Sequence, residues 1–135
     1  MLNDTKEYCR FYEELGDKEH FICLLDTGHS GLAGEDAASS IRILGPRLKA
    51  LHVNDNCYTD DHHLVPYQGM IDWDRILHAL ADIDYQGDFT FEALHLWERG
   101  DESFYPLQAR YLHEVGSYMV GRLMQCKKEK QACTR

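Results

Sequence analysis

Apolar side chains recur at helical spacing in four segments of the chain. In the first segment Tyr8, Phe11 and Leu15 fall on one helix face, and Gly16 follows them as a stop signal. Acidic residues precede the second segment, and Asp72 is placed to cap the start of the third. This periodicity predicts helices over residues 4–15, 35–44, 72–81 and 102–124.

Three short apolar runs lie between these helices, and each ends in a polar residue. Runs of this length and composition are typical of buried strands. Strands that alternate with helices form a parallel sheet through right-handed crossover connections. We therefore predict an α/β fold with about three parallel strands and flanking helices. The runs are residues 21–25 before Asp26, residues 48–51 before His52, and residues 89–91 before Glu92.

Length and composition favour a single domain. The chain has 135 residues, of which 44% are hydrophobic, enough for one core. It contains no internal repeat, low-complexity tract or linker. We predict one domain over residues 1–125 and a polar tail over residues 126–135. The tail holds the only basic cluster, Lys127-Lys128-Glu129-Lys130, which we expect to be solvated.

Charge and cysteine content narrow the class of protein further. With 14 basic and 23 acidic side chains the formal net charge is −9, which argues against nucleic acid as a partner. The five cysteines are odd in number and form no CxxC motif, so we expect reduced thiols. There is no signal-peptide pattern and no apolar stretch of membrane-spanning length. These features predict a soluble, cytoplasmic protein with no membrane partner.

The polar residues that end the three runs form a candidate metal site. The carboxyl ends of parallel strands meet at one edge of the sheet, so Asp26, His52 and Glu92 are expected to converge. Such ligands suit Mn, Mg, Zn or Co. Each residue alone has a structural interpretation, as a helix cap, a hydrogen-bonded histidine or the partner of a cation. Their occurrence at three equivalent strand ends favours one shared metal site.

Three further residues form a second candidate group. His29 lies three positions after Asp26, where a tight turn would bring it back to the same edge as a second-shell group, a substrate ligand or a ligand of a second metal. Asp61 and His63 are two positions apart, so in an extended segment their side chains point the same way. The structural alternative is a solvated loop in which these histidines are incidental.

The ordered set of motifs resembles the xylose isomerase-like TIM-barrel superfamily, in its sugar phosphate isomerase/epimerase branch. The resemblance covers about residues 20–120 and includes the C-terminal half of that fold only. It implies a partial (β/α)8 barrel whose strands correspond to strands six to eight. The motifs are Asp26-Thr27-Gly28-His29, then His52-Val53-Asn54-Asp55, then residues 61–73 with Asp61, His63, Pro66 and Gly69, then Tyr85-x-Gly87, and Glu92.

The resemblance assigns a role to each candidate residue. It implies a divalent metal held by two Glu, one Asp and one His, of which Asp26, His52 and Glu92 match three. By the same comparison His29 and His63 would bind a sugar or sugar-phosphate substrate. Glu92 also matches one of two carboxylates that move a proton at the carbon next to the carbonyl.

The chain also departs from the family pattern. A complete barrel takes about 250 residues, and the fourth ligand, a Glu that is also the partner acid/base, would lie on an earlier strand. We therefore expect weak or no activity unless a second chain completes the site. In addition, Tyr67-Gln68-Gly69 stands where the family usually has Gly-x-Gly.

Two other functions remain open. One is a non-catalytic half-barrel that binds metal or a partner and forms a homodimer or larger oligomer through its open sheet edges. The other is a zinc-dependent hydrolase related to apurinic-site endonucleases, whose multi-zinc cluster the six candidate residues also match. The acidic net charge counts against the second.

Overall fold

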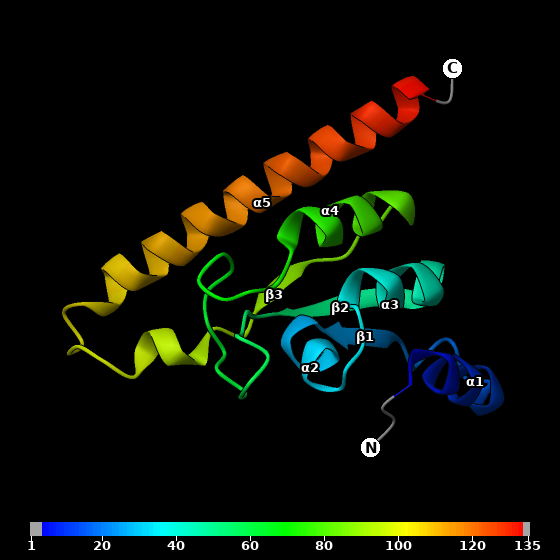
Figure 1. Cartoon of the computed structure of the whole chain (residues 1–135), viewed down its shortest axis with the longest axis horizontal. Coiled ribbons are helices and arrows are strands. Elements are labelled where there is room, and N and C mark those ends of the chain that lie inside the picture. Colours follow the sequence, from blue (N-terminus) through cyan, green and yellow to red (C-terminus); the bar gives the residue numbers. More distant parts are fainter. Residues whose placement is uncertain (1–3, 134–135) are drawn as a thin grey trace.

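The computed structural model describes residues 4–133 and has a three-stranded sheet at its centre (Figure 1). The strands are β1 (Cys23–Asp26), β2 (Leu48–Val53) and β3 (Phe89–Phe91). They lie in the order β1-β2-β3, and both neighbouring pairs are parallel. This confirms the predicted α/β fold with three parallel strands.

Helices α3, α4 and α5 follow one another along one face of the sheet (Figure 1). The buried cluster joins strand residues such as Leu25 and Leu51 to Ile41 of α3, Leu77 of α4 and Met119 of α5. The helices are α1 (Thr5–Leu15), α2 (Thr27–Leu32), α3 (Ala37–Leu44), α4 (Trp73–Asp82) and α5 (Tyr105–Cys133), with two short 3-10 helices, η1 (Gly45–Arg47) and η2 (Leu94–Trp97).

Aspartates cap the start of three helices, and among them Asp72 was predicted to do so. The Asp4 carboxylate accepts a hydrogen bond from Lys6 N at 2.7 Å, and the Asp72 carboxylate accepts one from Arg75 N at 3.0 Å. Asp36 caps α3 in the same way. These bonds satisfy backbone donors that the first turn of a helix leaves without partners. The first helix ends at Gly16, as predicted, with a left-handed φ of 71°.

Alternation along the strands gives the sheet one covered face and one open face. Cys23 and Leu25 in β1, and Leu51 and Val53 in β2, are buried against the helices. The residues between them point to the opposite face, as the two-residue period of a strand requires, and are only half-buried. The polar residues at the strand ends therefore lie on the open face.

The structure corrects two predicted boundaries near β1. Phe21 and Ile22 are outside the strand and about half-exposed, because the partner strand begins at Leu48, opposite Cys23. The tight turn predicted after Asp26 is instead part of a short helix, α2, which Asp26 caps by accepting a hydrogen bond from His29 N. This six-residue segment has no apolar periodicity that could have predicted a helix.

The end of the last helix is a further correction. Helix α5 continues to Cys133, nine residues beyond the predicted end at Met124, whereas residues 134 and 135 lie outside the described part. Lys127 Nζ donates to Tyr85 O at 2.6 Å, and Lys130 Nζ donates to Asp82 O at 2.7 Å. The two lysines thus bind carbonyl groups at the end of α4 and just after it. These contacts hold the last turns of α5 against α4, in a segment that we expected to be solvated.

The loop over residues 54–72 is organised by the fully buried Asp55. The backbone of Asp55 pairs with that of Leu64 in both directions, at 2.9 and 2.8 Å. Its carboxylate accepts four hydrogen bonds, from the backbone N of Asn56 at 2.8 Å, of Tyr67 at 2.9 Å and of Ile71 at 3.1 Å, and from Trp73 Nε1 at 2.8 Å. One carboxylate therefore fixes both ends of the loop.

Neither a disulfide nor a membrane span is found in residues 4–133. All five cysteines are free. No described helix combines the length and the apolar character needed to cross a bilayer.

We expect Asp55→Ala to lower the free energy of unfolding by about 3–5 kcal/mol, because it leaves several buried donors without an acceptor. Denaturant unfolding followed by far-UV circular dichroism measures the loss. Asp60→Ala is the matched control, since Asp60 is an exposed carboxylate of the same loop, and should change stability by no more than about 0.5 kcal/mol. A loss below about 1 kcal/mol for Asp55→Ala would contradict this account of the loop.

Candidate metal centre

The strand register brings Asp26, His52 and Glu92 to one place. Asp26 lies opposite His52 in the sheet, and Glu92 N donates to Val53 O at 3.0 Å, so the β2–β3 ladder continues to Glu92. One ligand atom of each side chain lies within 4.8 Å of the other two. His52 Nδ1 is 2.9 Å from Glu92 Oε2 and 3.9 Å from Asp26 Oδ2. We call these three residues the strand-end group.

Two carboxylate oxygens in the strand-end group are without a hydrogen bond. Asp26 Oδ2 and Glu92 Oε2 are both buried atoms, and neither accepts a hydrogen bond of acceptable geometry, although His52 Nδ1 lies 2.9 Å from Glu92 Oε2. Buried polar atoms in proteins are nearly always satisfied, because an unmet acceptor loses the solvation that water would give it. A cation bound between these oxygens and the His52 imidazole would satisfy both. The donor set of two carboxylates and one imidazole therefore fits a divalent ion.

A second group lies beside the first and consists of His29, Asp61 and His63. Asp61 Oδ2 is 3.1 Å from His29 Nε2 and 3.1 Å from His63 Nε2. His63 has a left-handed φ of 46°, so the segment is not extended as predicted, although the side chains of Asp61 and His63 still meet. The other nitrogen of His63, Nδ1, faces Glu92 O at 2.8 Å. We call these residues the loop group.

His29 connects the two groups. Its Nε2 faces Asp61 in the loop group, and its Nδ1 lies 3.3 Å from Asp26 Oδ2 in the strand-end group. The structure thus brings together all six residues that the sequence singled out, in two adjacent clusters that share one imidazole.

Electrostatics in the loop group favour charged imidazoles. The hydrogen bond with Asp61 raises the pKa of His29, and the charge of Asp26 adds to this effect. Burial, the largest influence on His63, lowers its pKa, but the Glu92 carbonyl and the Asp61 carboxylate outweigh it and leave the pKa raised. A raised histidine pKa stabilises the fold fully below about pH 6.5, and this contribution is lost as pH rises through the folded-state pKa.

Asp61 responds in the opposite direction. Burial alone would raise its pKa, but the hydrogen bonds from His29 and His63 and the charges of these residues lower it. The loop group is therefore a carboxylate held between two imidazole rings whose raised pKa values favour the protonated form. Protonated rings attract negatively charged or strongly polar oxygen atoms.

The sequence did not assign a role to Asn54, which is fully buried beside Asp26. Asp26 Oδ1 accepts one hydrogen bond from Asn54 Nδ2 at 3.0 Å and another from His29 N at 2.9 Å. The sequence did contain a signal that places Asn54 at the site. Asn54 follows His52 by two positions, and the side-chain period of a strand puts both on one face.

Comparison with known proteins identifies similar chains. A family model described as xylose isomerase-like TIM barrel matches residues 1–112. The chain is 36% identical over 92 residues to a D-psicose 3-epimerase of Enterocloster bolteae, which covers 68% of this chain and 29% of that protein. It is 34% identical over 90 residues to an uncharacterized protein of Sinorhizobium fredii, covering 67% of this chain and 29% of that protein.

A solved structure of an L-ribulose 3-epimerase has the same fold. It superposes with a TM-score of 0.74 at 19% sequence identity, over 99% of this chain and 46% of that chain. The chain thus spans less than half of this structure and about 29% of the length of the two curated relatives.

Proposed function

Because the chain belongs to the xylose isomerase-like TIM-barrel family, we propose that it is the C-terminal half of a divalent-metal-dependent isomerase or epimerase of sugars or sugar phosphates. The observation that carries this proposal is the strand-end group, in which two buried carboxylate oxygens accept no hydrogen bond and face one imidazole. The similarity to proteins named as sugar epimerases supports a sugar as the substrate.

The residues of the strand-end group would have distinct tasks. Asp26, His52 and Glu92 would hold Mn, Mg, Co or Zn. The bound ion would polarise the sugar carbonyl and so favour loss of the proton from the adjacent carbon. Glu92 would take that proton or return it. A second carboxylate on the other face of the sugar would carry out the opposite transfer.

The loop group would bind the substrate. The raised pKa values of His29 and His63 favour protonated rings, whose positive charge would attract the hydroxyl or phosphate oxygens of a substrate. His63 is held by the carbonyl of Glu92 itself, at 2.8 Å. A substrate oxygen bound by His63 would therefore lie close to the carboxylate that handles the proton.

The group is incomplete by comparison with the family, which uses a second Glu as fourth ligand and partner acid/base. The residues of this chain that meet at the strand ends supply three ligands. We therefore infer that this chain binds metal by itself but turns over substrate weakly unless another polypeptide supplies the second carboxylate.

We expect the chain to bind one divalent ion. Asp26→Asn, His52→Gln and Glu92→Gln should each weaken binding by about 100-fold or more, because loss of a ligand costs more than the 10–100-fold known for residues that only support ligands. Titration calorimetry with Mn²⁺ and Zn²⁺ measures both affinity and stoichiometry. His95→Gln with Glu98→Gln is a matched control, because it removes an exposed His–Glu pair at 3.0 Å. Wild-type affinity in all three strand-end variants would rule out this site, and two or three tightly bound zinc ions would favour the hydrolase alternative.

We expect the chain alone to exchange the C3 hydrogen of D-psicose or L-ribulose for deuterium slowly, because one of the two carboxylates is absent. Co-expression with the preceding part of the Enterocloster relative should raise the exchange rate at least tenfold, and Glu92→Gln should abolish the gain. Exchange in D2O is followed by NMR. Rapid turnover by the chain alone would contradict the incomplete site.

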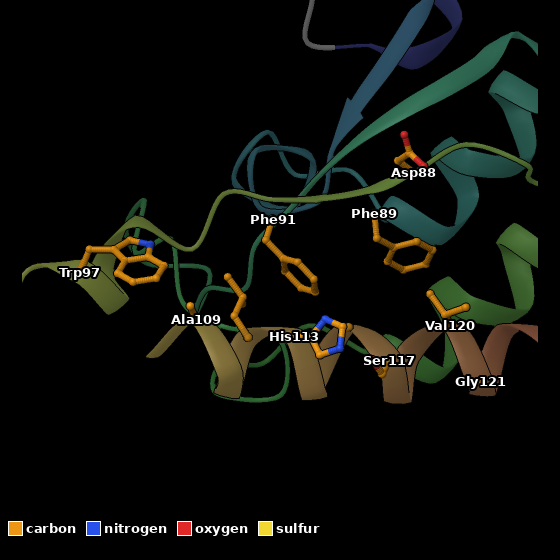
Figure 2. A pocket seen from close by; sticks show the side chains of 11 residues that line it. Asp88, Phe89, Phe91, Trp97, Ala109, His113, Ser117, Val120 and Gly121 are labelled. Carbon is orange, nitrogen blue, oxygen red and sulfur yellow. The ribbon is translucent and has the colours of Figure 1, made fainter. Parts of the chain in front are cut away.

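A second candidate function, assembly with a partner, is favoured by a specific groove between β3 and α5. Phe89 and Phe91 point from β3 toward α5, whose His113, Ser117 and Val120 line the opposite wall (Figure 2). The groove is mainly apolar, with a cavity volume of about 880 Å³. Sheet edges and apolar patches of this kind commonly pair with another chain.

The opposite edge of the sheet is better protected. Helix α1 lies beside β1, and Leu24 N of that strand donates to the Tyr8 hydroxyl at 3.3 Å. A backbone donor of β1 is thus satisfied from within the chain. This difference favours the β3 side as the surface of self-association.

We expect the chain to form a homodimer or larger oligomer at micromolar concentration through the groove, and Val120→Glu to shift it to monomer by placing a charge on the apolar wall. Light scattering coupled to size-exclusion chromatography at about 0.15 M salt, where charge repulsion is screened beyond about 8 Å, measures the mass. Phe11→Glu on α1 is the control, since Phe11 is 49% exposed on the β1 side. A monomeric wild-type chain would refute self-association, and a monomer produced by Phe11→Glu alone would place the interface on the β1 side.

A further inference from the structure

The two oxygens of the Asp26 carboxylate have different surroundings. Oδ1 accepts hydrogen bonds from His29 N at 2.9 Å and from Asn54 Nδ2 at 3.0 Å. Oδ2 accepts none and lies near both His52 Nδ1 and His29 Nδ1. Two donors on one oxygen fix the rotation of the carboxylate and turn the other oxygen toward the strand-end group.

Asn54 is itself held rigidly. Its backbone N donates to Thr27 Oγ1 at 3.1 Å, and Thr27 Oγ1 donates to the backbone O of Asn54 at 2.7 Å. The side chain packs so closely on Gly28 that a β-carbon there would overlap the Asn54 carboxamide. The absence of a side chain at residue 28 is therefore what gives the carboxamide its place next to Asp26.

The orientation of the carboxamide follows from the charge of its partner. With Nδ2 toward Asp26, the amide donates to a carboxylate oxygen and leaves its own Oδ1 without a hydrogen bond. The flipped orientation would place two acceptor oxygens against each other, which is less favourable than one unmet acceptor. Asp26 thus determines which way Asn54 points, and Asn54 in turn constrains Asp26.

We propose that Asn54 is a positioning residue that restricts Asp26 to a single coordinating oxygen, Oδ2, for a divalent ion in the strand-end group. This inference rests on the proposed metal site and adds to it a residue that is not itself a ligand. Without the amide, only the hydrogen bond from His29 N constrains Oδ1, so the carboxylate can rotate further and offer both oxygens. Affinity then falls and the coordination of the ion changes.

The test compares Asn54→Ala with Asn56→Ala in the full chain. Both asparagines are fully buried and both lie against the start of α2, but Asn56 Nδ2 donates to Gly28 O at 2.9 Å and not to a residue of the strand-end group. We expect Asn54→Ala to weaken Mn²⁺ binding by about 10–100-fold, and Asn56→Ala to weaken it less than about threefold, well below that range. Equal effects of the two substitutions would overturn the proposal.

The double variant separates positioning from general damage. If Asn54 acts through Asp26, Asn54→Ala should have almost no further effect on Mn²⁺ affinity in an Asp26→Ala background. The visible spectrum of bound Co²⁺ gives a second readout, because a change from one to two Asp26 oxygens alters the coordination number, and loss of fold stability alone does not. An undiminished effect in the Asp26→Ala background, or an unchanged Co²⁺ spectrum in Asn54→Ala, would overturn the proposal.

A measurement on the unmodified chain covers the case in which Asn54→Ala does not fold. The Asn54 side-chain amide should shift in the ¹H–¹⁵N spectrum during a Zn²⁺ titration, and by more than the Asn56 amide. An unmoved Asn54 amide in a chain that binds Zn²⁺ would overturn the positioning role and leave the metal site intact. A chain that binds no Zn²⁺ would instead overturn the proposed function on which this inference rests.

Discussion

The geometry of the candidate site depends on one buried carboxylate that is not part of it. Asp55 accepts four hydrogen bonds from the loop over residues 54–72 and from the first residue of α4. A charge buried this deeply is tolerated because each of its lone pairs meets a donor. The loop it closes carries Asp61 and His63 back over the strand ends. Without that anchor, Asp61 and His63 would be held near the strand ends by fewer contacts, chiefly those with His29 and with the Glu92 carbonyl.

The two groups differ in the kind of support they receive. Asp26, His52 and Glu92 stand at the ends of paired strands, where the sheet register sets their spacing to within narrow limits. Asp61 and His63 belong to an irregular segment, in which His63 adopts a left-handed backbone conformation. If the proposed roles hold, a rigid group would bind the ion and a more adaptable group would bind the substrate, as is common where loops on a rigid scaffold contribute to a site.

The sequence predicted the features that depend on local pattern. Apolar runs ending in Asp26, His52 and Glu92 were sufficient to predict three parallel strands and a shared edge, and the predicted cap Asp72 located the start of α4. The pattern could not predict α2, because this helix has only six residues and almost no apolar side chains. Nor could it predict that α5 would continue to Cys133, since that depends on lysine contacts with carbonyl groups distant in the sequence. The role of Asp55 could not be predicted either, because the sequence does not show whether an aspartate is buried or solvated. Tyr67 shows the same limit, as it takes a φ of 72° where the family usually has Gly and packs on Trp73 and Tyr118.

The open face of the sheet determines how strongly charges act in the site. Helices cover one side of the strands, and the His52 and Glu92 side chains on the other side remain 40% and 30% exposed. Water that reaches these groups raises the local dielectric constant, and two charges at a given separation interact several-fold more weakly in water than in a dry interior. Electrostatic stabilisation of a developing negative charge is strongest where water is excluded. Covering this face would therefore strengthen the interactions among the charges already present, even without a further ligand.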